Sequence, residues 1–397
     1  MNTLLRVFLE RTIRAGSLVV VDPAGKQHRF GDGSPASVRV RFSSPAAERA
    51  IVLNPQMKLG EAFMDGSFVV EDGSIYDFLA LVLSNDQNPR PSRVAALLAR
   101  FRHLTRHMHI ANTKTRARDN ASHHYDIDRR LYSLFLDSDL QYSCAYFETP
   151  DVGLDEAQMR KKQHLAAKLL LRPGMSVLDI GSGYGGLAFH LAETYGVTVT
   201  GVTLSTEQLA VAQERAAERG LEGKVRFLLQ DYRDVAGRFD RIISVGMFEH
   251  VGPDAYPRFF RQCYDLLTPD GVLLLHTVGR THGPARTNTW VAKYIFPGGA
   301  SPALSEVIPD IEKSGFVLAD LEILRLHYAE TLRAWRQRFL ANRGAAKALF
   351  DERFCRMWEF YLAAFEASFR FDDLVVFQFQ LTKRLDSAPR TRSYLYS

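Results

Sequence analysis

Short apolar runs alternate with segments of helical periodicity over the central part of the chain. The apolar runs cover residues 177–180, 197–202, 225–229, 242–245 and 272–276, and helical patterns occupy 187–195 and 207–219. Short apolar runs bounded by turn residues and separated by helices are typical of parallel strands whose two faces are both covered. The sequence therefore predicts an α/β domain built on a parallel sheet.

The amino-terminal part has a different pattern. Apolar runs at 19–21, 38–42 and 68–70 are broken by Gly, Asp and Pro, and 76–83 has helical periodicity, which predicts a small α+β domain. Residues 1–14 place Leu5, Phe8, Leu9 and Ile13 at helical spacing with charged residues between them. This predicts an amphipathic helix rather than a secretory signal.

Turn and linker residues follow at 84–93, and an arginine-rich helical pattern extends over 93–108. A polar stretch at 112–122 adds further basic residues. We therefore expect three parts: a small amino-terminal domain over 1–90, a basic helix and linker over 91–122, and a catalytic domain over 123–397.

Composition narrows the class of protein. The 397 residues include 50 Lys and Arg against 45 Asp and Glu, which favours an anionic partner. The three cysteines form no CxxC pair, which indicates a reducing compartment and no zinc site. No apolar run approaches the roughly 20 residues that a membrane span requires, so we expect a soluble or peripheral protein.

Candidate chemistry is concentrated where the predicted strands end. The first strand of the α/β region ends at Asp179 and continues into Gly181-Ser182-Gly183-Tyr184-Gly185-Gly186, a turn that lets a nucleotide-like ligand approach the backbone closely. By itself this pattern also fits a structural turn or a dinucleotide site. S-adenosylmethionine is favoured because the glycine spacing is tight and Asp231 follows the third strand. Gln208 lies one helical turn after the second strand, where most methyltransferases carry an acidic ribose ligand.

Several longer motifs are more specific. They are 142–147 (YSCAYF), 201–205 (GVTLS), 230–234 (QDYRD), 245–252 (VGMFEHVG), 276–279 (HTVG) and 293–299 (KYIFPGG), with 124–126 and 327–328 in the same order and 59–66 (LGEAFMDG) near the amino terminus. Together they resemble the family of cyclopropane-fatty-acyl-phospholipid synthases and mycolic acid methyltransferases. The resemblance implies a Rossmann-like class I S-adenosylmethionine methyltransferase domain beside a smaller α+β, lipid-interacting amino-terminal domain.

The same resemblance implies a reaction and its residues. A methyl group is transferred from S-adenosylmethionine to the cis double bond of an unsaturated phospholipid acyl chain, and a protein-held bicarbonate ion then removes a proton so that a cyclopropane ring closes. The implied bicarbonate ligands are Cys144, Glu249, His276, the backbone amide of Val278, and Tyr328. The expected cofactor contacts are Tyr142, Ser143, Asp179, Gly181, Ser182, Gly183, Thr203, Gln208, Asp231 and Tyr232. Taken singly, Cys144 and His276 would be read as packed core residues and Tyr328 as a helix cap.

Partners follow from the substrate. Residues 93–118 offer arginines to an anionic membrane surface, although a solvated linker explains them equally well. Nucleic acid is not expected, since aromatic side chains on which bases stack are scarce in this stretch. The resemblance further suggests a homodimer that is cytoplasmic and peripheral at the inner membrane.

Three alternatives remain open at this stage. A related fatty-acid methyltransferase would leave a methylene or methyl branch instead of a ring, a lipid-binding scaffold would carry an inactive methyltransferase domain, and a small-molecule methyltransferase would lack a lipid substrate. Head-group, double-bond position and acyl-length preferences are not determined by the sequence.

Overall fold

The computed structural model describes residues 1–34, 37–85 and 129–396. These residues group into two compact units, each formed by separate stretches of chain. One unit contains the described residues up to Asn85 together with Thr287–Pro297 and Ala329–Asp373. The other contains the described residues from Arg129 to Arg286, with Gly298–Tyr328 and the chain from Leu374 onward. We call them the amino-terminal unit and the methyltransferase unit.

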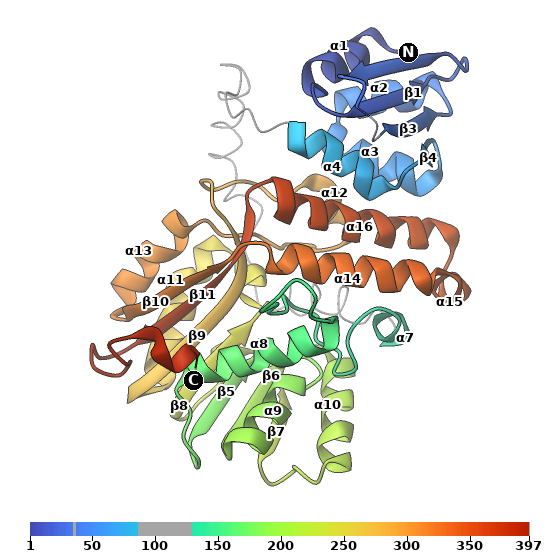
Figure 1. Cartoon of the computed structure of the whole chain (residues 1–397). Helices are drawn as coiled ribbons and strands as arrows, with labels where there is room; N and C mark the ends of the chain where they lie inside the picture. Colours follow the sequence, from blue (N-terminus) through green and yellow to red (C-terminus); the bar gives the residue numbers. More distant parts are fainter. Residues whose placement is uncertain (35–36, 86–128, 397) are drawn as a thin grey trace. The chain divides into compact units, whose positions relative to one another are not determined.

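The methyltransferase unit is built on a seven-stranded sheet with the order β10-β11-β9-β8-β5-β6-β7 (Figure 1). Its strands are β5 (Ser176–Ile180), β6 (Thr198–Thr203), β7 (Val225–Leu229), β8 (Phe239–Val245), β9 (Leu267–Arg280), β10 (Val317–Leu324) and β11 (Leu374–Thr382). The five strands β5 to β9 are parallel, and β11 inserts antiparallel between β9 and β10. The parallel sheet confirms the predicted fold class, and the sequence pattern missed only β10 and β11 of this sheet.

Both faces of this sheet are buried, and neighbouring residues on one strand point to opposite cores. Val177 packs with Leu187 and Ala212 on one face, whereas Leu178 packs with Phe259 and other residues on the second face. The first face is covered by α8 (Leu154–Leu169), α9 (Gly186–Tyr195) and α10 (Thr206–Glu218), and the second by α11 (Tyr256–Leu266) and α13 (Leu304–Ser314). Continuous apolar strands are the consequence of this two-sided burial.

The amino-terminal unit has its own four-stranded sheet with the order β2-β1-β3-β4. The strands are β1 (Ser17–Val21), β2 (Gln27–Gly31), β3 (Ser37–Phe42) and β4 (Phe68–Asp72), and the accompanying helices are α1 (Thr3–Thr12), α2 (Pro45–Leu53), α3 (Pro55–Asp65) and α4 (Ile75–Asn85). Strands β1 and β3 are parallel, and the outer pairs are antiparallel. A mixed sheet with helices agrees with the α+β character expected for this region.

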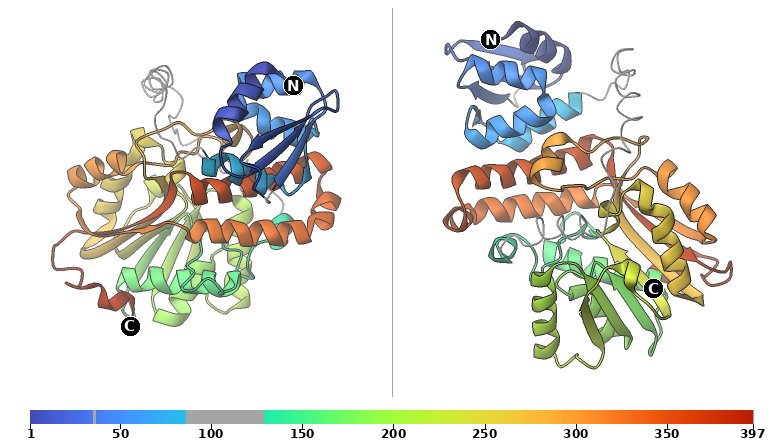
Figure 2. Two further views of the ribbon diagram at one scale, coloured as in Figure 1. Left: turned by 45° about the horizontal axis from the view of Figure 1, so that its top comes forward. Right: turned by 180° about the vertical axis from the view of Figure 1, so that it is seen from behind.

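Late segments of the chain complete the amino-terminal unit. They form α12 (Thr289–Tyr294), most of α14 (His327–Ala341), α15 (Arg343–Leu349) and α16 (Glu352–Phe371). α14 and α16 lie side by side (Figures 1 and 2), joined by the ion pairs Arg336–Glu366 and Arg370–Glu330. Gly60 on α3 lies so close to the Trp290 indole that a Cβ atom there would be only 2.5 Å from it.

The predicted division into residues 1–90, 91–122 and 123–397 therefore remains a prediction. In the structure, part of the stretch expected in the catalytic domain packs with the first 85 residues instead. The carboxyl-terminal aromatics Trp358, Phe360, Tyr361 and Phe369 are buried, and Phe365 and Phe371 are partly buried. The predicted basic helix and linker lie outside the described residues.

Candidate active site

A cavity opens at the carboxyl ends of β5, β6, β7 and β8 in the methyltransferase unit. Gly181 and Gly183 follow β5 with positive φ angles of +85° and +54°. A Cβ atom at Gly183 would meet no other atom within 4 Å, so the chain turns there beside open space. Only glycine adopts such a turn without strain, and the ends of parallel strands are where such sheets bind their ligands.

All ten residues predicted to contact the cofactor line this one cavity. They come from the ends of the three strands β5, β6 and β7 and from the loop before α8. Other lining residues were not among the predicted contacts, and they include Tyr132, Gln141, Leu204, Arg233, Met247, His250 and Val251. Leu204, Met247, His250 and Val251 lie inside the quoted motifs, so the sequence carried a signal for them. Tyr132 and Gln141 carried none.

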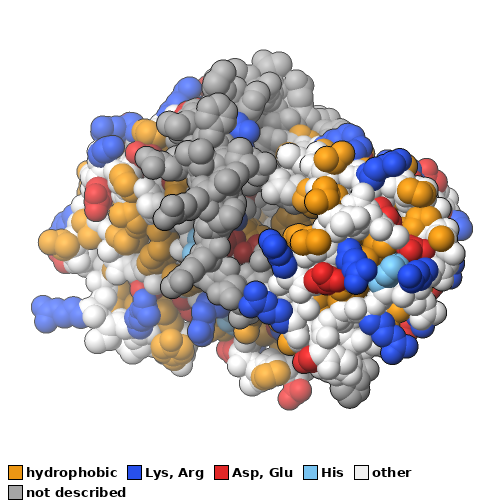
Figure 3. Space-filling view, turned by 90° about the horizontal axis from the view of Figure 1, so that it is seen from above, with side chains coloured by type: hydrophobic (Ala, Val, Ile, Leu, Met, Phe, Trp, Pro, Cys, Tyr) orange, Lys and Arg blue, Asp and Glu red, His pale blue; other side chains and the backbone are white. Residues whose placement is uncertain are grey.

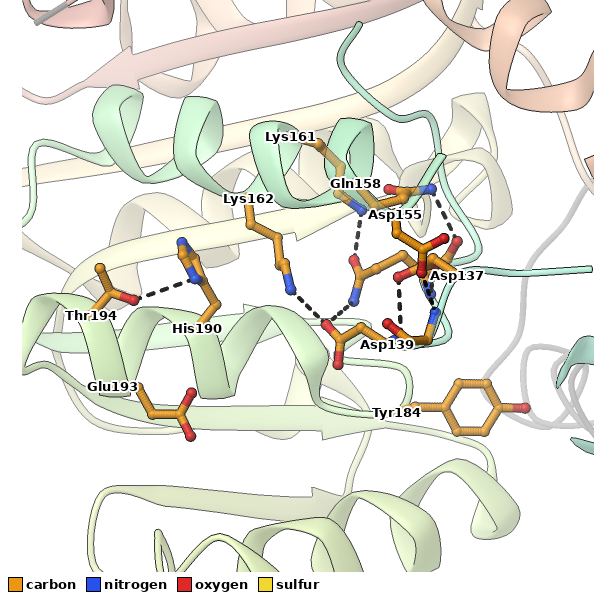
Figure 4. A network of polar contacts seen from close by, with 12 residues as sticks. Asp137, Asp139, Asp155, Gln158, Lys161, Lys162, Tyr184, His190, Glu193 and Thr194 are labelled. Carbon is orange, nitrogen blue, oxygen red and sulfur yellow. Dashed lines mark hydrogen bonds and ion pairs between the residues drawn. The ribbon is translucent and has the colours of Figure 1, made fainter. Parts of the chain in front are cut away.

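One face of α8 holds the loop before it in place. Gln158, Lys161 and Lys162 lie at i, i+3 and i+4 and therefore point to the same side of the helix, as Figure 4 shows. Gln158 Nε2 donates to the Ser143 carbonyl at 3.0 Å. Lys161 Nζ donates to Gln141 Oε1 at 2.6 Å and to Ser143 Oγ at 2.9 Å. Two cavity-lining side chains are thus positioned by a buried ammonium group.

The second lysine of this face anchors the start of the loop. Lys162 pairs with Asp139 at 2.8 Å, and Arg215 from α10 pairs with the same carboxylate. Although burial opposes it, these two cations hold the pKa of Asp139 below its usual value. The carboxylate therefore stays charged and ties α8, α10 and the loop together.

Asp179 is a buried ionisable side chain in the lining of the cavity. Its side chain is buried, and burial raises the pKa of Asp179 to about 7, with Lys161 acting in the opposite direction. Burial also lowers the pKa of Lys161 to about 8, although nearby carboxylates oppose this. A buried carboxyl with a strongly shifted pKa in a cavity is a candidate ligand contact, and it favours a cationic group of the ligand.

The end of β6 is organised by its own side chains. Thr203 Oγ1 donates to Gln208 Oε1 at 2.9 Å, and Ser205 Oγ accepts from the backbone N–H of Gln208 at 3.2 Å. Because its oxygen faces Thr203, the amide nitrogen of Gln208 is the part of the side chain left to donate to a ligand.

The 3₁₀ turn η2 (Tyr232–Asp234) follows β7 and carries two of the predicted contacts. Asp231 caps this turn, and its carboxylate already accepts from the guanidinium and the backbone amide of Arg233. The Tyr232 ring packs edge-on against Phe259 at 5.4 Å, and burial raises the pKa of its hydroxyl. Tyr232 is therefore a fixed apolar wall, and Asp231 acts within an ion pair.

The five residues predicted to hold bicarbonate, Cys144, Glu249, His276, Val278 and Tyr328, are called the predicted base site below. Val278 N–H donates to Glu249 Oε1 at 2.6 Å. Within the described ranges, Glu249 Oε2 is buried and has no hydrogen-bond partner. Burial raises the pKa of Glu249 to about 7, and the Val278 amide opposes this. Because the Val278 amide already donates to Glu249, the predicted contact between this amide and bicarbonate stays a prediction.

His276 lies next to this pair, on the same face of β9 as Val278. Its Nδ1 contacts Gln378 Nε2 at 3.1 Å, and its carbonyl accepts from the amide of the cavity-lining Gly246 at 3.0 Å. Burial lowers the pKa of His276 to about 3, so the ring is neutral. Glu249 follows the cavity-lining Met247 by two residues, and none of the five base-site residues is itself among the residues that line the cavity.

Cys144 and Tyr328 connect to this region through their chain neighbours. Cys144 is buried and follows the cavity-lining Ser143, and its thiol donates to the Ala145 carbonyl at 3.3 Å. Tyr146 stacks on His327 with ring centroids 4.8 Å apart, and His327 Nδ1 accepts from the Phe147 amide. Tyr328 is half-buried and is the second residue of α14. It directly follows His327, which contacts the segment that carries Cys144.

Most of the chain is similar to known proteins. Residues 112–379 match the family described as mycolic acid cyclopropane synthetase, and residues 12–90 match a domain family of unknown function. The cyclopropane-fatty-acyl-phospholipid synthase of Escherichia coli strain K12 is 38% identical over 357 residues, which is 90% of each chain. The tuberculostearic acid methyltransferase of Mycobacterium tuberculosis is 41% identical over 286 residues, covering 68% of this chain and 66% of that protein.

Solved structures show the same relationship. The cyclopropane synthase MmaA2 from Mycobacterium tuberculosis superposes with a TM-score of 0.64 at 35% identity, covering 66% of this chain and 97% of that one. The mycolic acid cyclopropane synthase CmaA1, solved with SAH and CTAB, gives the same values of TM-score, identity and coverage.

Proposed function

Because the chain belongs to the mycolic acid cyclopropane synthetase family, we propose that it transfers the methyl group of S-adenosylmethionine to the double bond of an unsaturated phospholipid acyl chain. A cyclopropane ring then closes after a proton is lost from the new methyl group. One observation carries this proposal: a single cavity collects all ten expected cofactor contacts, and its lining residue Gly246 donates a backbone hydrogen bond to the His276 carbonyl.

The cavity suits S-adenosylmethionine. When bound, this cofactor supplies an electrophilic methyl group on a sulfonium centre. Asp179 provides a carboxylate for the cofactor's α-ammonium group, and Ser143, whose oxygen accepts from Lys161, keeps its hydroxyl proton to donate to the α-carboxylate. The Gln208 amide nitrogen is available for the ribose. Among the described residues, the buried Ser182 Oγ also has no partner, as expected for a group that waits for a ligand.

The predicted base site suits a small oxyanion that carries its own O–H. Bicarbonate would supply a weak base that does not add to a carbocation. Glu249 Oε2 offers an unused buried acceptor for that O–H, and His276 offers a neutral ring nitrogen. Two carboxylate-like groups tolerate each other here only when one of them donates a proton to the other, and the raised pKa of Glu249 fits such sharing.

The chain's own residues have three tasks in this reaction. The glycine turn and the loop over 137–143 orient the cofactor, since an isolated alkene is a weak nucleophile and needs close positioning. Apolar lining residues such as Met247 and Val251 exclude water from a cationic centre. Glu249 and His276 hold the proton acceptor beside the position where the new methyl group forms.

We also propose that the protein works on anionic bilayers as a peripheral protein. Over the described ranges, no helix has the length and apolar character needed to cross a membrane. α1 buries Leu5 and Leu9 but leaves Leu4, Val7 and Phe8 exposed on another side, next to Arg6 and Arg11. Hydrophobic side chains also lie among Lys and Arg on the face drawn in Figure 3. A helix that exposes apolar and basic side chains together, as α1 does, can insert shallowly into a bilayer while its arginines contact lipid phosphates.

The decisive experiment supplies labelled S-adenosylmethionine and vesicles of unsaturated phospholipid. We expect label in the lipid and high-field cyclopropane protons in the product NMR spectrum. Methylene or methyl-branch signals would instead establish the related fatty-acid methyltransferase, because mass alone does not separate the isomers. A protein that binds no cofactor in calorimetry would be the inactive scaffold.

Membrane docking is tested separately with the double variant Leu4→Ser, Phe8→Ser. It should sediment less with anionic vesicles, whereas Leu385→Ser, a control at an exposed leucine far along the chain, should sediment normally. The homodimer that the family resemblance suggests is part of the same proposal, and analytical ultracentrifugation tests it. The arginine-rich stretch expected to meet the membrane lies outside the described residues.

A further inference from the structure

A row of buried polar side chains leads away from His276. Gln378 on β11 lies between His276 and Lys168 on α8, with Nε2 at 3.1 Å from His276 Nδ1 and Oε1 accepting from Lys168 Nζ at 2.7 Å. All three side chains are at most 2% exposed. None of the quoted sequence motifs contains Gln378 or Lys168, and the proposed reaction does not use either of them directly.

Glu322, at the far end of this row of buried side chains, is ionised. Glu322 on β10 pairs with Lys168 and also contacts His164 Nε2 at 2.6 Å. Burial opposes ionisation of Glu322, but hydrogen bonds from His164 and Lys168 outweigh it and lower its pKa to about 2. The carboxylate is therefore charged, and it keeps the Lys168 ammonium beside Gln378.

Donor and acceptor rules then determine the orientation of each group in turn. An ammonium group has only donors, so it must face the oxygen of the Gln378 amide. The amide nitrogen therefore faces His276, and an amide nitrogen is only a donor. His276 Nδ1 must accept, which means that it carries no proton. In a neutral imidazole the proton is then on Nε2.

We propose that Lys168 and Gln378 are positioning residues that lock His276 in its neutral Nε2–H tautomer, so that the ring presents a donor to the oxyanion held at the predicted base site. The lock also disfavours the doubly protonated ring, because an Nδ1–H would point at the N–H of Gln378. This inference rests on the proposed function for the role of His276, but the tautomer itself does not depend on catalysis.

The test is Gln378→Glu, which keeps the shape of the side chain and reverses its role toward His276. The carboxylate accepts from Lys168 and equally from an Nδ1–H, so His276 should change to the Nδ1–H tautomer or become doubly protonated. ¹⁵N NMR of histidine-labelled protein without cofactor reads the tautomer directly, and a His276→Asn variant assigns the signal. We expect kcat to fall roughly 10- to 100-fold, as for outer partners of ligating histidines, with cofactor affinity unchanged.

Two further variants separate the lock from general damage to this row of buried side chains. Glu322→Asp disturbs the packing of the same network but keeps the carboxylate that pairs with Lys168, so the Lys168 ammonium stays the donor and the Nε2–H tautomer should persist. Lys168→Met removes the donor, frees the amide to rotate, and should allow both tautomers.

An Nδ1–H signal in the unmodified protein, or an Nε2–H signal that survives in Gln378→Glu, would overturn the proposal. If the tautomers respond as expected but no lipid is ever methylated, the lock stands and the proposed function fails.

Discussion

The cofactor cavity and the predicted base site are joined by the hydrogen bond from the Gly246 amide to the His276 carbonyl, but they are constructed in different ways. The cavity is made by loops that directly follow consecutive strands, and among the described residues Ser182 Oγ has no hydrogen-bond partner there. In the base site, one oxygen of Glu249 and one ring nitrogen of His276 are held by β9 and β11 residues far away in sequence. The cavity therefore offers a hydrogen-bonding group to a ligand, whereas the contacts of Glu249 and His276 fix each side chain in one orientation.

This comparison predicts that variants of the two regions separate affinity from turnover. The largest effect is expected for Glu249→Gln, which replaces the buried acceptor Oε2 with a group of the same size. Loss of a positioned proton acceptor typically costs about 10²- to 10⁴-fold in rate. We expect kcat to fall within this range while calorimetry gives an unchanged affinity for S-adenosylmethionine. Normal turnover would remove Glu249 from the mechanism.

A matched control for this variant is Glu207→Gln, a substitution of the same type on α10 outside both regions. Glu207 accepts a hydrogen bond from the exposed amide of Arg129. Turnover in Glu207→Gln should remain close to that of the unmodified protein. An equal loss in both variants would indicate general damage to the fold.

The opposite separation is expected for Asp179→Asn in the cavity. A hydrogen bond to a charged group contributes about 1.5–3 kcal/mol, so affinity for S-adenosylmethionine should fall roughly 10- to 100-fold. At saturating cofactor the rate should recover, since the base site is untouched. Calorimetry and a cofactor titration of the rate check both parts. A rate that stays low at saturation would mean that Asp179 also acts during the reaction.

The same variant makes a prediction about pH and stability without any ligand. The pKa of Asp179 is raised from 3.8 to about 7 on folding. A raised folded-state pKa means that its stability contribution is complete below pH 3.8 and is lost as pH rises through 7. Asp179→Asn should therefore stabilise the cofactor-free protein increasingly between pH 4 and pH 8.

Thermal unfolding of the unmodified protein and of Asp179→Asn across this pH range tests the direction of this pH dependence. The quantity to compare is the difference between their melting temperatures. His250 and His276, whose pKa values are lowered to about 4 and about 3, make the stability of both proteins rise with pH over part of the range. A difference in melting temperature that shrinks toward pH 8 would contradict the burial of an uncharged Asp179 carboxyl.

The two regions also differ in how far the sequence predicted them. Thr203, Gln208 and Tyr232 lie at or shortly after the ends of apolar strands, and parallel strands bring such positions together at one edge of the sheet. The sequence pattern located this edge, and the family resemblance named the individual residues. Lys161, Lys168 and Gln378 could not be found in this way. A lysine on an amphipathic helix is normally read as exposed, and only the folded chain shows that α8 turns these two lysines inward.

The predicted domain boundaries remain a prediction for a related reason. α14 and α16 are amphipathic helices that follow the α/β pattern, and nothing local indicates which sheet they accompany. Trp290 and Phe360 pack together in the amino-terminal unit, with ring centroids 4.8 Å apart. Both rings are buried, but burial alone does not identify the partner against which a helix packs.

The smallest expected effect tests whether the cavity is prepared for a ligand at some cost to the fold. Ser182 Oγ is buried, lines the cavity, and lacks a hydrogen-bond partner in the part of the chain that the structure describes. Ser182→Ala removes an unsatisfied group, so the cofactor-free protein should melt at the same or a slightly higher temperature. Affinity for S-adenosylmethionine should fall by roughly 2- to 10-fold, the equivalent of one neutral hydrogen bond. Ser244→Ala is the matched control, because the Ser244 hydroxyl, also buried, already donates to the Ile180 carbonyl at 3.2 Å. It should lose stability and keep its affinity, and if the two serines behaved alike, the contrast between a waiting cavity and a satisfied interior would not hold.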